Sequence, residues 1–185
     1  MSKPNELDLR FVEYLEGLVR NEDRAALAAL RRGLGKEPGA APEMHRHVVP
    51  RQPKDRLGQD LYYLIAALFA THQGSWKAQG TSDHGRSFGA SMARLKEATK
   101  SESIERRFVA LLNSHRDDLP AHLRHAVSLL KSKEIPIDWP LLLYDLRSWD
   151  HPDRFVQRTW AGDFWSGSEE AGEKEADPTS MKETV

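Results

Sequence analysis

The sequence predicts an all-α protein, a helical bundle made of two packed helical subdomains. Three observations point to this fold class. Leucine and aromatic residues recur at spacings of three and four residues along most of the chain, which is the period of one face of an α-helix. No stretch alternates β-branched or aromatic residues with polar ones, as a half-buried strand requires. No internal repeat of solenoid length is visible, which argues against a repeat array.

The N-terminal segment predicts a helical hairpin. The apolar stripe of its first helix consists of Leu7, Phe11, Leu15 and Leu18. Asn5 precedes that stripe and is suited to cap the helix N-terminus. A second helix is expected to be capped by Asn21 and to stop near Gly35. Its apolar side consists of Leu27, Leu30 and Leu34.

A third helix is expected from Asp55 to His72. Its segment 61–70 is apolar on all sides, which indicates a buried central helix rather than a surface helix. That segment is only half as long as the roughly 20 residues that a membrane span needs, so no membrane association is expected. The connection over 35–54 carries four prolines, and loops of such length are often functional.

Five further helical stripes are expected in the C-terminal part, beyond a glycine-containing loop at 73–86 that marks the divide between the subdomains. They lie over 87–98 and 102–114, after Asp118, behind Asp138 and from Pro152 onward. Aspartate is a capping residue, and proline is preorganised for a first helical turn. Three tryptophans fall on the stripes and are predicted to be core residues, namely Trp139, Trp149 and Trp160.

Composition and charge exclude several functions. The chain has 27 basic and 28 acidic residues, a formal charge of −1, so nucleic-acid or membrane binding needs charge segregated into patches. The absence of cysteine excludes a disulfide scaffold, a thiolate zinc site and a cysteine nucleophile. The N-terminal segment lacks the basic and apolar regions of a signal peptide, and we expect a cytoplasmic protein.

The last twenty residues differ from the rest in composition. Residues 166–185 hold six acidic and two basic residues, a net charge of −4, which leaves +3 on residues 1–165. A segment with so few apolar residues cannot offset its ordering entropy. We therefore expect a helical domain over residues 1–165 and a disordered acidic tail over residues 166–185, whose charge can compete for a basic face.

Basic residues along the predicted helix faces are the candidate functional residues, because lysine and arginine neutralise phosphate charge without reading base sequence. The candidates for nucleic-acid contact are Arg24, Arg31, Arg32, Arg86, Arg94, Arg107, Lys131 and Lys133. Arg124 shares a helical face with Lys131. Trp76 lies in a polar loop and is a candidate for an exposed contact. The alternative is that these basic residues only form the charged, solvated faces that amphipathic helices need in any case.

The eight histidines form no defined ligand pattern such as His-Glu-x-x-His, so neither a metal nor a cofactor is expected. An enzymatic alternative is a metal-independent ribonuclease, in which His122 acts as general base and Arg116 stabilises the developing charge. Pro120 lies between them and suggests a helix boundary, so the two side chains are not expected to share a face. Glycine-rich phosphate loops, serine elbows and paired catalytic carboxylates are absent.

Several segments taken together resemble one family. They are 61–72 (LYYLIAALFATH), 103–112 (SIERRFVALL), 119–124 (LPAHLR), 129–139 (LLKSKEIPIDW), 145–152 (DLRSWDHP) and 161–165 (AGDFW). In their order and spacing these blocks resemble the small, or B, subunit of the type I-E CRISPR-associated Cascade surveillance complex. The resemblance covers the chain from Phe11 to Trp165.

The resemblance implies a non-enzymatic, all-helical subunit in antiviral defence, with no cofactor. Its implied partners are other Cascade subunits, a second copy of itself arranged head to tail, the guide CRISPR RNA and the target DNA. It is implied to stabilise the R-loop through basic surface residues, while guide–target base pairing reads the sequence. A ribonuclease that uses Arg116 and His122, or a purely protein-binding helical scaffold, are the alternatives.

Overall fold

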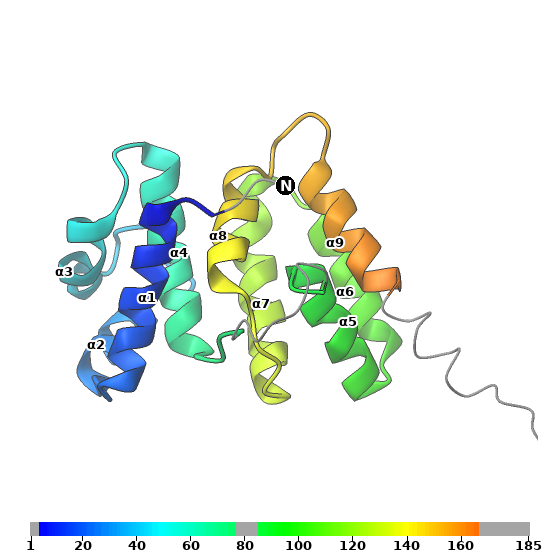
Figure 1. Ribbon diagram of the computed structural model, residues 1–185, viewed down its shortest axis with the longest axis horizontal. Helices are drawn as coiled ribbons and strands as arrows, with labels where there is room; N and C mark the ends of the chain where they lie inside the picture. The colour runs from blue at the N-terminus through cyan, green and yellow to red at the C-terminus, as the bar shows by residue number, and fades with distance from the viewer. Residues whose placement is uncertain (1–3, 77–84, 167–185) are drawn as a thin grey trace, which may run out of the picture.

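The computed structural model describes residues 4–76 and 85–166 (Figure 1). Those residues form nine α-helices and three short 3-10 helices with no strand among them, so the predicted all-α class is confirmed. The α-helices are α1 (Glu6–Arg20), α2 (Arg24–Arg31), α3 (His45–Val48), α4 (Arg56–Thr71), α5 (Phe88–Thr99), α6 (Glu102–Leu112), α7 (Leu119–Ser132), α8 (Trp139–Arg147) and α9 (Phe155–Ser166). The 3-10 helices are η1 (Pro42–Met44), η2 (Val49–Arg51) and η3 (Arg116–Asp118).

The side chains that cap helix N-termini in the structure include those before α1, α4 and α8. Asn5, Asp55 and Asp138 each accept a hydrogen bond from the backbone amide of the third residue of their helix, at 2.8, 2.6 and 3.0 Å respectively. Such a bond satisfies one of the amides that a helix N-terminus leaves without a partner, so it favours a helix start at that position. The sequence prediction of these starts is confirmed.

The predicted cap of the second helix is wrong by two residues. Asn21 ends α1, and Glu22 takes a left-handed conformation with φ of 53°. The cap is therefore Asp23, whose carboxylate accepts a hydrogen bond from the third residue of α2 at 2.9 Å. α2 itself ends at Arg31, earlier than the predicted stop near Gly35.

The last helix begins at Phe155 rather than near Pro152. Arg154 has a φ of 48°, in the left-handed region that an α-helix excludes, so the helix starts after it. The Nη2 atom of Arg154 donates to the carbonyl oxygen of Leu112 at 2.8 Å, which satisfies a carbonyl at the end of α6. The proline-rich connection over 35–54, expected as a loop, contains the short helices η1, α3 and η2.

In Figure 1, helices α1, α2 and α4 pack together on the left side of the molecule. α4 is the buried central helix that the sequence predicts, because every residue from Leu61 to Ala70 except Leu64 is buried. The ring of Phe11 on α1 stacks on the ring of Tyr62 on α4, with centroids 4.1 Å apart. Removing this apolar surface from water stabilises the N-terminal half of the fold.

Helices α5, α6 and α9 pack together on the right side of Figure 1. α5 crosses α9 so closely at Gly89 that a Cβ atom there would overlap the carbonyl oxygen of Trp160. Only glycine permits such an approach of two backbones. Trp139, Trp149 and Trp160 are at most 2% exposed, so their predicted place in the core is confirmed.

Helices α7 and α8 lie between these two groups of helices (Figure 1). α7 contacts α4 on one side and α5 and α6 on the other. α8 follows α7 in the chain, yet it packs back against α1 and α4. The buried apolar residues of both groups form one contiguous core, so the halves pack as a single body.

No helix in the described ranges is both long enough and apolar enough to cross a membrane. Ser166, the first residue of the predicted acidic tail, is the last residue of α9. The expected disorder of the remaining tail concerns residues 167–185, which lie outside the described residues. Most of the predicted loop at 73–86 also lies outside them, since residues 77–84 are not described.

Candidate nucleic-acid interface

The eight cations expected to contact nucleic acid fall into two groups. Four are exposed, with side chains that have no hydrogen bond or ion pair to any residue in the described ranges: Arg24, Arg107, Lys131 and Lys133. Four have a partner in the protein: Arg31, Arg32, Arg86 and Arg94. An unpaired charge is available to neutralise phosphate, whereas a paired arginine must first give up its contact.

Arg86 is part of the structural frame. Its Nη2 and Nε atoms lie 2.5 and 2.9 Å from Oδ2 of Asp138, a carboxylate whose side chain is only 4% exposed. Because Asp138 also caps α8, this ion pair ties the segment before α5 to the start of α8. Removing the arginine would leave a buried carboxylate without its counter-charge. The guanidinium is therefore committed to a structural contact.

Arg94 is likewise engaged inside the protein. Its guanidinium lies 4.5 Å from the ring centroid of Trp76, and its Nη2 atom donates to the carbonyl oxygen of Gly85 at 2.7 Å. Burial lowers the pKa of Arg94. Trp76, which the sequence suggests as an exposed contact, is half-buried beside this arginine. Its backbone amide donates to the carbonyl oxygen of Ile137 at 3.0 Å.

Arg32 forms a surface ion pair. Its Nη1 atom lies 2.6 Å from a carboxylate oxygen of Glu43, and both side chains are well exposed. A hydrogen bond from its own backbone amide and the Arg32 guanidinium hold the pKa of Glu43 below its ordinary value. Solvent screens exposed pairs of this kind, so they contribute little to stability and a phosphate can compete for this arginine.

The C-terminal end of α4 brings together cations from both halves of the molecule. Arg31 of α2 donates from Nε to the carbonyl oxygen of Ala70 at 2.8 Å. On the α7 side, burial lowers the pKa of His72, and the nearby charge of Lys131 lowers it further. Arg124 lies two turns before Lys131 on α7, and its side chain reaches the turn after α2. We refer to Arg31, Arg124 and Lys131 as the junction cluster.

Arg124 is the member that is missing from the predicted contacts. Its guanidinium packs so closely on the turn after α2 that a Cβ on Gly35 would overlap it. Gly35 also has a φ of 75°, a left-handed conformation that favours glycine. Within the described part of the chain, Arg124 has no hydrogen bond or ion pair. The signal that could have identified it is its seven-residue spacing from Lys131, which places both on one face of α7.

The surroundings of the junction cluster are net positive. Segments 31–43 and 124–134 together hold six lysine or arginine residues and three carboxylates. The formal charge of the whole chain is −1, so positive charge is concentrated here. This is the segregation that a nearly neutral protein needs in order to bind a polyanion. Arg24 lies at the far end of α2, and Arg107 lies on α6 in the other half of the molecule (Figure 1).

A groove of about 590 Å³ lies beside the junction cluster. The turn after α2, one face of α4, and η3 with the start of α7 form its walls. Its lining includes Lys36, Leu57, Tyr63, Arg116 and Arg124. Of the junction cluster, Arg124 lines this groove, and its guanidinium reaches from α7 to the turn after α2.

The residues of the alternative ribonuclease are not paired in the structure. The Nη1 atom of Arg116 donates to the carbonyl oxygen of Leu146 at 2.9 Å, and the same guanidinium forms an ion pair with Asp150. Within residues 4–76 and 85–166, no hydrogen bond or ion pair joins Arg116 to His122. Those ranges also hold no group of three His, Asp or Glu side chains placed to bind a metal ion.

Sequence comparison links the chain to one family. The family model for the CRISPR-associated protein Cse2 matches residues 26–165. The CRISPR-associated protein Cse2 of Thermus thermophilus is 37% identical over 176 residues, which cover 91% of this chain and 96% of that protein.

Solved structures agree with this result. The CasB protein of M. ruber superposes with a TM-score of 0.77 at 31% identity, over 92% of this chain and 99% of that chain. A chain of a solved CRISPR RNA-guided surveillance complex gives a TM-score of 0.76 at 30% identity, over 92% of this chain and 98% of that one. Sequence and structure thus match over nearly the whole length of these relatives. The chain belongs to the CRISPR-associated Cse2 family.

Proposed function

We propose that this chain is the non-catalytic small subunit of a type I-E CRISPR RNA-guided surveillance complex. In this role it binds nucleic-acid backbone through the junction cluster and stabilises the R-loop during antiviral defence. The observation that carries the proposal is that Arg31 and Lys131 lie near the C-terminal end of α4, while Arg124, on the same face of α7 as Lys131, reaches the turn after α2. The similarity to a chain of a solved surveillance complex supports the assembly.

The chemistry of the junction cluster suits phosphate rather than bases. Guanidinium and ammonium groups neutralise phosphate charge and release counterions, whatever the base sequence. In RNA-guided complexes the reading of sequence is delegated to base pairing, and the exchange of DNA pairs for RNA–DNA pairs is nearly balanced. A few backbone contacts are then enough to shift that exchange toward the open form.

The same proposal defines the partners and the location of the chain. It acts with other Cascade subunits, a second copy of itself, the guide CRISPR RNA and the target DNA, in the cytoplasm. It uses no cofactor and has no catalytic step of its own. The engagement of Arg116 with α8 supports this, because an arginine held by Leu146 and Asp150 is not free to stabilise a reacting phosphate.

The test replaces Arg31, Arg124 and Lys131 with alanine in the full-length chain and measures binding to labelled single- and double-stranded DNA at several salt concentrations. We expect affinity to fall for every sequence alike, and the slope of log K against log salt to shallow by roughly one unit per lost phosphate contact. In the assembled complex, discrimination between matched and mismatched targets should persist, because base pairing supplies it.

A matched control removes positive charge elsewhere. Lys54→Ala with Arg158→Ala deletes two exposed cations, one beside the opposite end of α4 and one on α9. If the control loses as much affinity per charge as the cluster variant, the binding is a bulk charge effect and the cluster is not its site. Unchanged binding by the cluster variant favours a scaffold that contacts only proteins. RNA cleavage that is lost in His122→Ala would favour the ribonuclease.

A further inference from the structure

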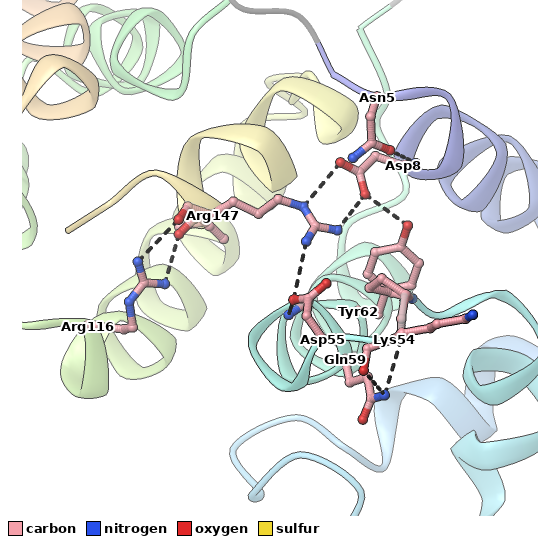
Figure 2. A network of polar contacts seen from close by, with 11 residues as sticks. Asn5, Asp8, Lys54, Asp55, Gln59, Tyr62, Arg116 and Arg147 are labelled. Carbon is pink, nitrogen blue, oxygen red and sulfur yellow. Dashed lines mark hydrogen bonds and ion pairs between the residues drawn. The ribbon is translucent and has the colours of Figure 1, made fainter. Parts of the chain in front are cut away.

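A buried ion pair links α8 to α1 and α4 (Figure 2). The carboxylate of Asp8 on α1 is fully buried. Arg147 on α8 donates to its two oxygens, from Nη2 at 2.8 Å and from Nε at 3.3 Å. The hydroxyl of Tyr62 on α4 donates to the same carboxylate at 2.9 Å. Three helices therefore meet at one carboxylate.

A second arginine continues these contacts to α7. Arg116 lies in η3, directly before α7, and its side chain points to the end of α8 (Figure 2). It donates to the carbonyl oxygen of Leu146 at 2.9 Å and to that of Arg147 at 3.4 Å. Together with the Asp8 contacts, this gives a continuous path from α1 and α4 through α8 to α7. We call Asp8, Arg116 and Arg147 the relay.

The opposite ends of α4 and α7 are also joined. The Nε2–H of His72 donates to the carbonyl oxygen of Ile135 at 2.6 Å, just beyond the end of α7. The groove of about 590 Å³ lies along α4 and α7 between the relay and this contact. The contacts at both ends of α4 and α7 add to the direct packing of the two helices and fix their positions relative to each other.

We propose that the relay residues are positioning residues for nucleic-acid binding, because they hold the α2 side and the α7 side of the junction cluster at a fixed separation. The inference rests on the proposed function and adds its structural requirement. Cations on two rigid walls contact neighbouring phosphates together only when their separation matches that of the phosphates. When the walls can shift, the second contact becomes less frequent and the combined affinity falls.

The sign of one substitution separates positioning from simple charge. Asp8 is 0% exposed, so it does not touch a bound nucleic acid. Asp8→Asn removes a negative charge, and electrostatics alone would therefore raise affinity for a polyanion. A positioning role predicts the opposite, because the asparagine keeps the shape of the side chain but weakens the contact with Arg147.

The experiment measures binding of the full-length wild type and Asp8→Asn to a labelled single-stranded oligonucleotide over a salt series, at a temperature where circular dichroism shows both folded. We expect affinity to fall roughly threefold to tenfold and the salt slope to shallow by about one unit, the effect of one lost phosphate contact. Arg116→Lys should act in the same direction. It keeps the charge but loses the planar fork that reaches two carbonyl groups.

Glu105→Gln is the matched control. It also removes one carboxylate, and it breaks an ion pair with Lys96 of 2.5 Å that joins α5 to α6, away from the groove. This variant should bind as tightly as the wild type or more tightly. If Asp8→Asn does not fold, Arg116→Lys decides the question.

The outcomes distinguish the two proposals. If Asp8→Asn or Arg116→Lys binds with the same affinity and the same salt slope as the wild type, the positioning role alone is overturned. Absence of salt-dependent binding by the wild-type chain, alone and in the assembled complex, overturns the proposed function and the positioning role with it.

Discussion

Asp145 shows how burial changes the chemistry of a single residue. It lies on α8 with 7% of its surface exposed, and it accepts a hydrogen bond from the indole of Trp160 at 2.7 Å. Burial raises the pKa of Asp145 to about 7, and the nearby carboxylates Asp138 and Asp163 add to this. The hydrogen bond from Trp160 opposes the shift. Removal from water therefore dominates over the one favourable contact.

This shift predicts a pH-dependent contribution to stability. The folded pKa of about 7 lies above the usual value of about 3.9, so the folded state holds a proton that the unfolded state releases. The contribution is fully present below about pH 4, falls as pH rises toward 7 and is lost above it. Asp145→Asn removes this dependence. Its free energy of unfolding relative to wild type should rise by roughly 2 kcal/mol between pH 5 and pH 8, as measured by urea denaturation.

The test compares how the free energy of unfolding of each protein changes with pH, because the substitution also changes the contact with Trp160 at every pH. Parallel pH profiles for the wild type and Asp145→Asn would show that this carboxyl is ionised in the folded state throughout the range.

At the scale of secondary structure, the crossing of α5 and α9 depends on one missing side chain. Gly89 lets the two backbones meet, and the neighbouring ring of Phe88 packs at 5.1 Å from the ring of Trp160. The group that a new Cβ would meet is a backbone carbonyl, which cannot rotate away as a flexible side chain can. The two helices would have to move apart and unpack the aromatic cluster between them.

Gly89→Ala should therefore lower the free energy of unfolding by about 2 kcal/mol or more, as overpacking typically does. Thermal or urea unfolding measures this loss. Gly162 provides a control of opposite sign. It lies on α9, and a Cβ atom added there would meet no atom within 4 Å, so Gly162→Ala should stabilise the helix by roughly 0.5–1 kcal/mol. Equal effects of the two substitutions would show that helix propensity, not the crossing, controls the cost.

At the scale of the whole molecule, charge is distributed unevenly along the chain. Residues 167–185 carry a net charge of −4, whereas the sequence segments that hold the junction cluster are net positive. The match to the Cse2 family ends at residue 165, before this acidic segment begins. Its composition offers almost no apolar side chains that could add to the core.

Removal of residues 167–185 should change the free energy of unfolding by no more than about 0.5 kcal/mol, because the segment lacks apolar anchors. The melting temperature should therefore stay nearly the same. The truncation keeps Ser166, whose hydroxyl donates to the carbonyl oxygen of Gly162 at 2.5 Å within α9. Nucleic-acid binding should become modestly tighter, since a charge of −4 is removed, and the gain should shrink at high salt. A large drop in melting temperature would mean that the segment packs against the helical domain.

Local chemistry accounts for what could be predicted from the sequence. The spacing of apolar residues, the capping side chains Asn5, Asp55 and Asp138 and the core tryptophans all depend on neighbours within a few turns. They identify the helices and their buried faces, and with the resemblance of several segments they led to the family. The start of α9 and the cap of α2 were missed because a left-handed residue, Arg154 or Glu22, shifts the helix start.

The partners of the charged residues could not be predicted in this way. Arg86 and Asp138 lie 52 residues apart in sequence, and Arg147 and Asp8 lie 139 apart. A helical stripe shows which side of a helix is apolar, but not which helix will lie opposite its charged margin. That depends on how α8 folds back onto α1 and α4, and a contact between charges depends on their distance in space. Only the tertiary structure therefore decided which arginines brace the fold and which, such as Arg124, form no hydrogen bond or ion pair within the described residues.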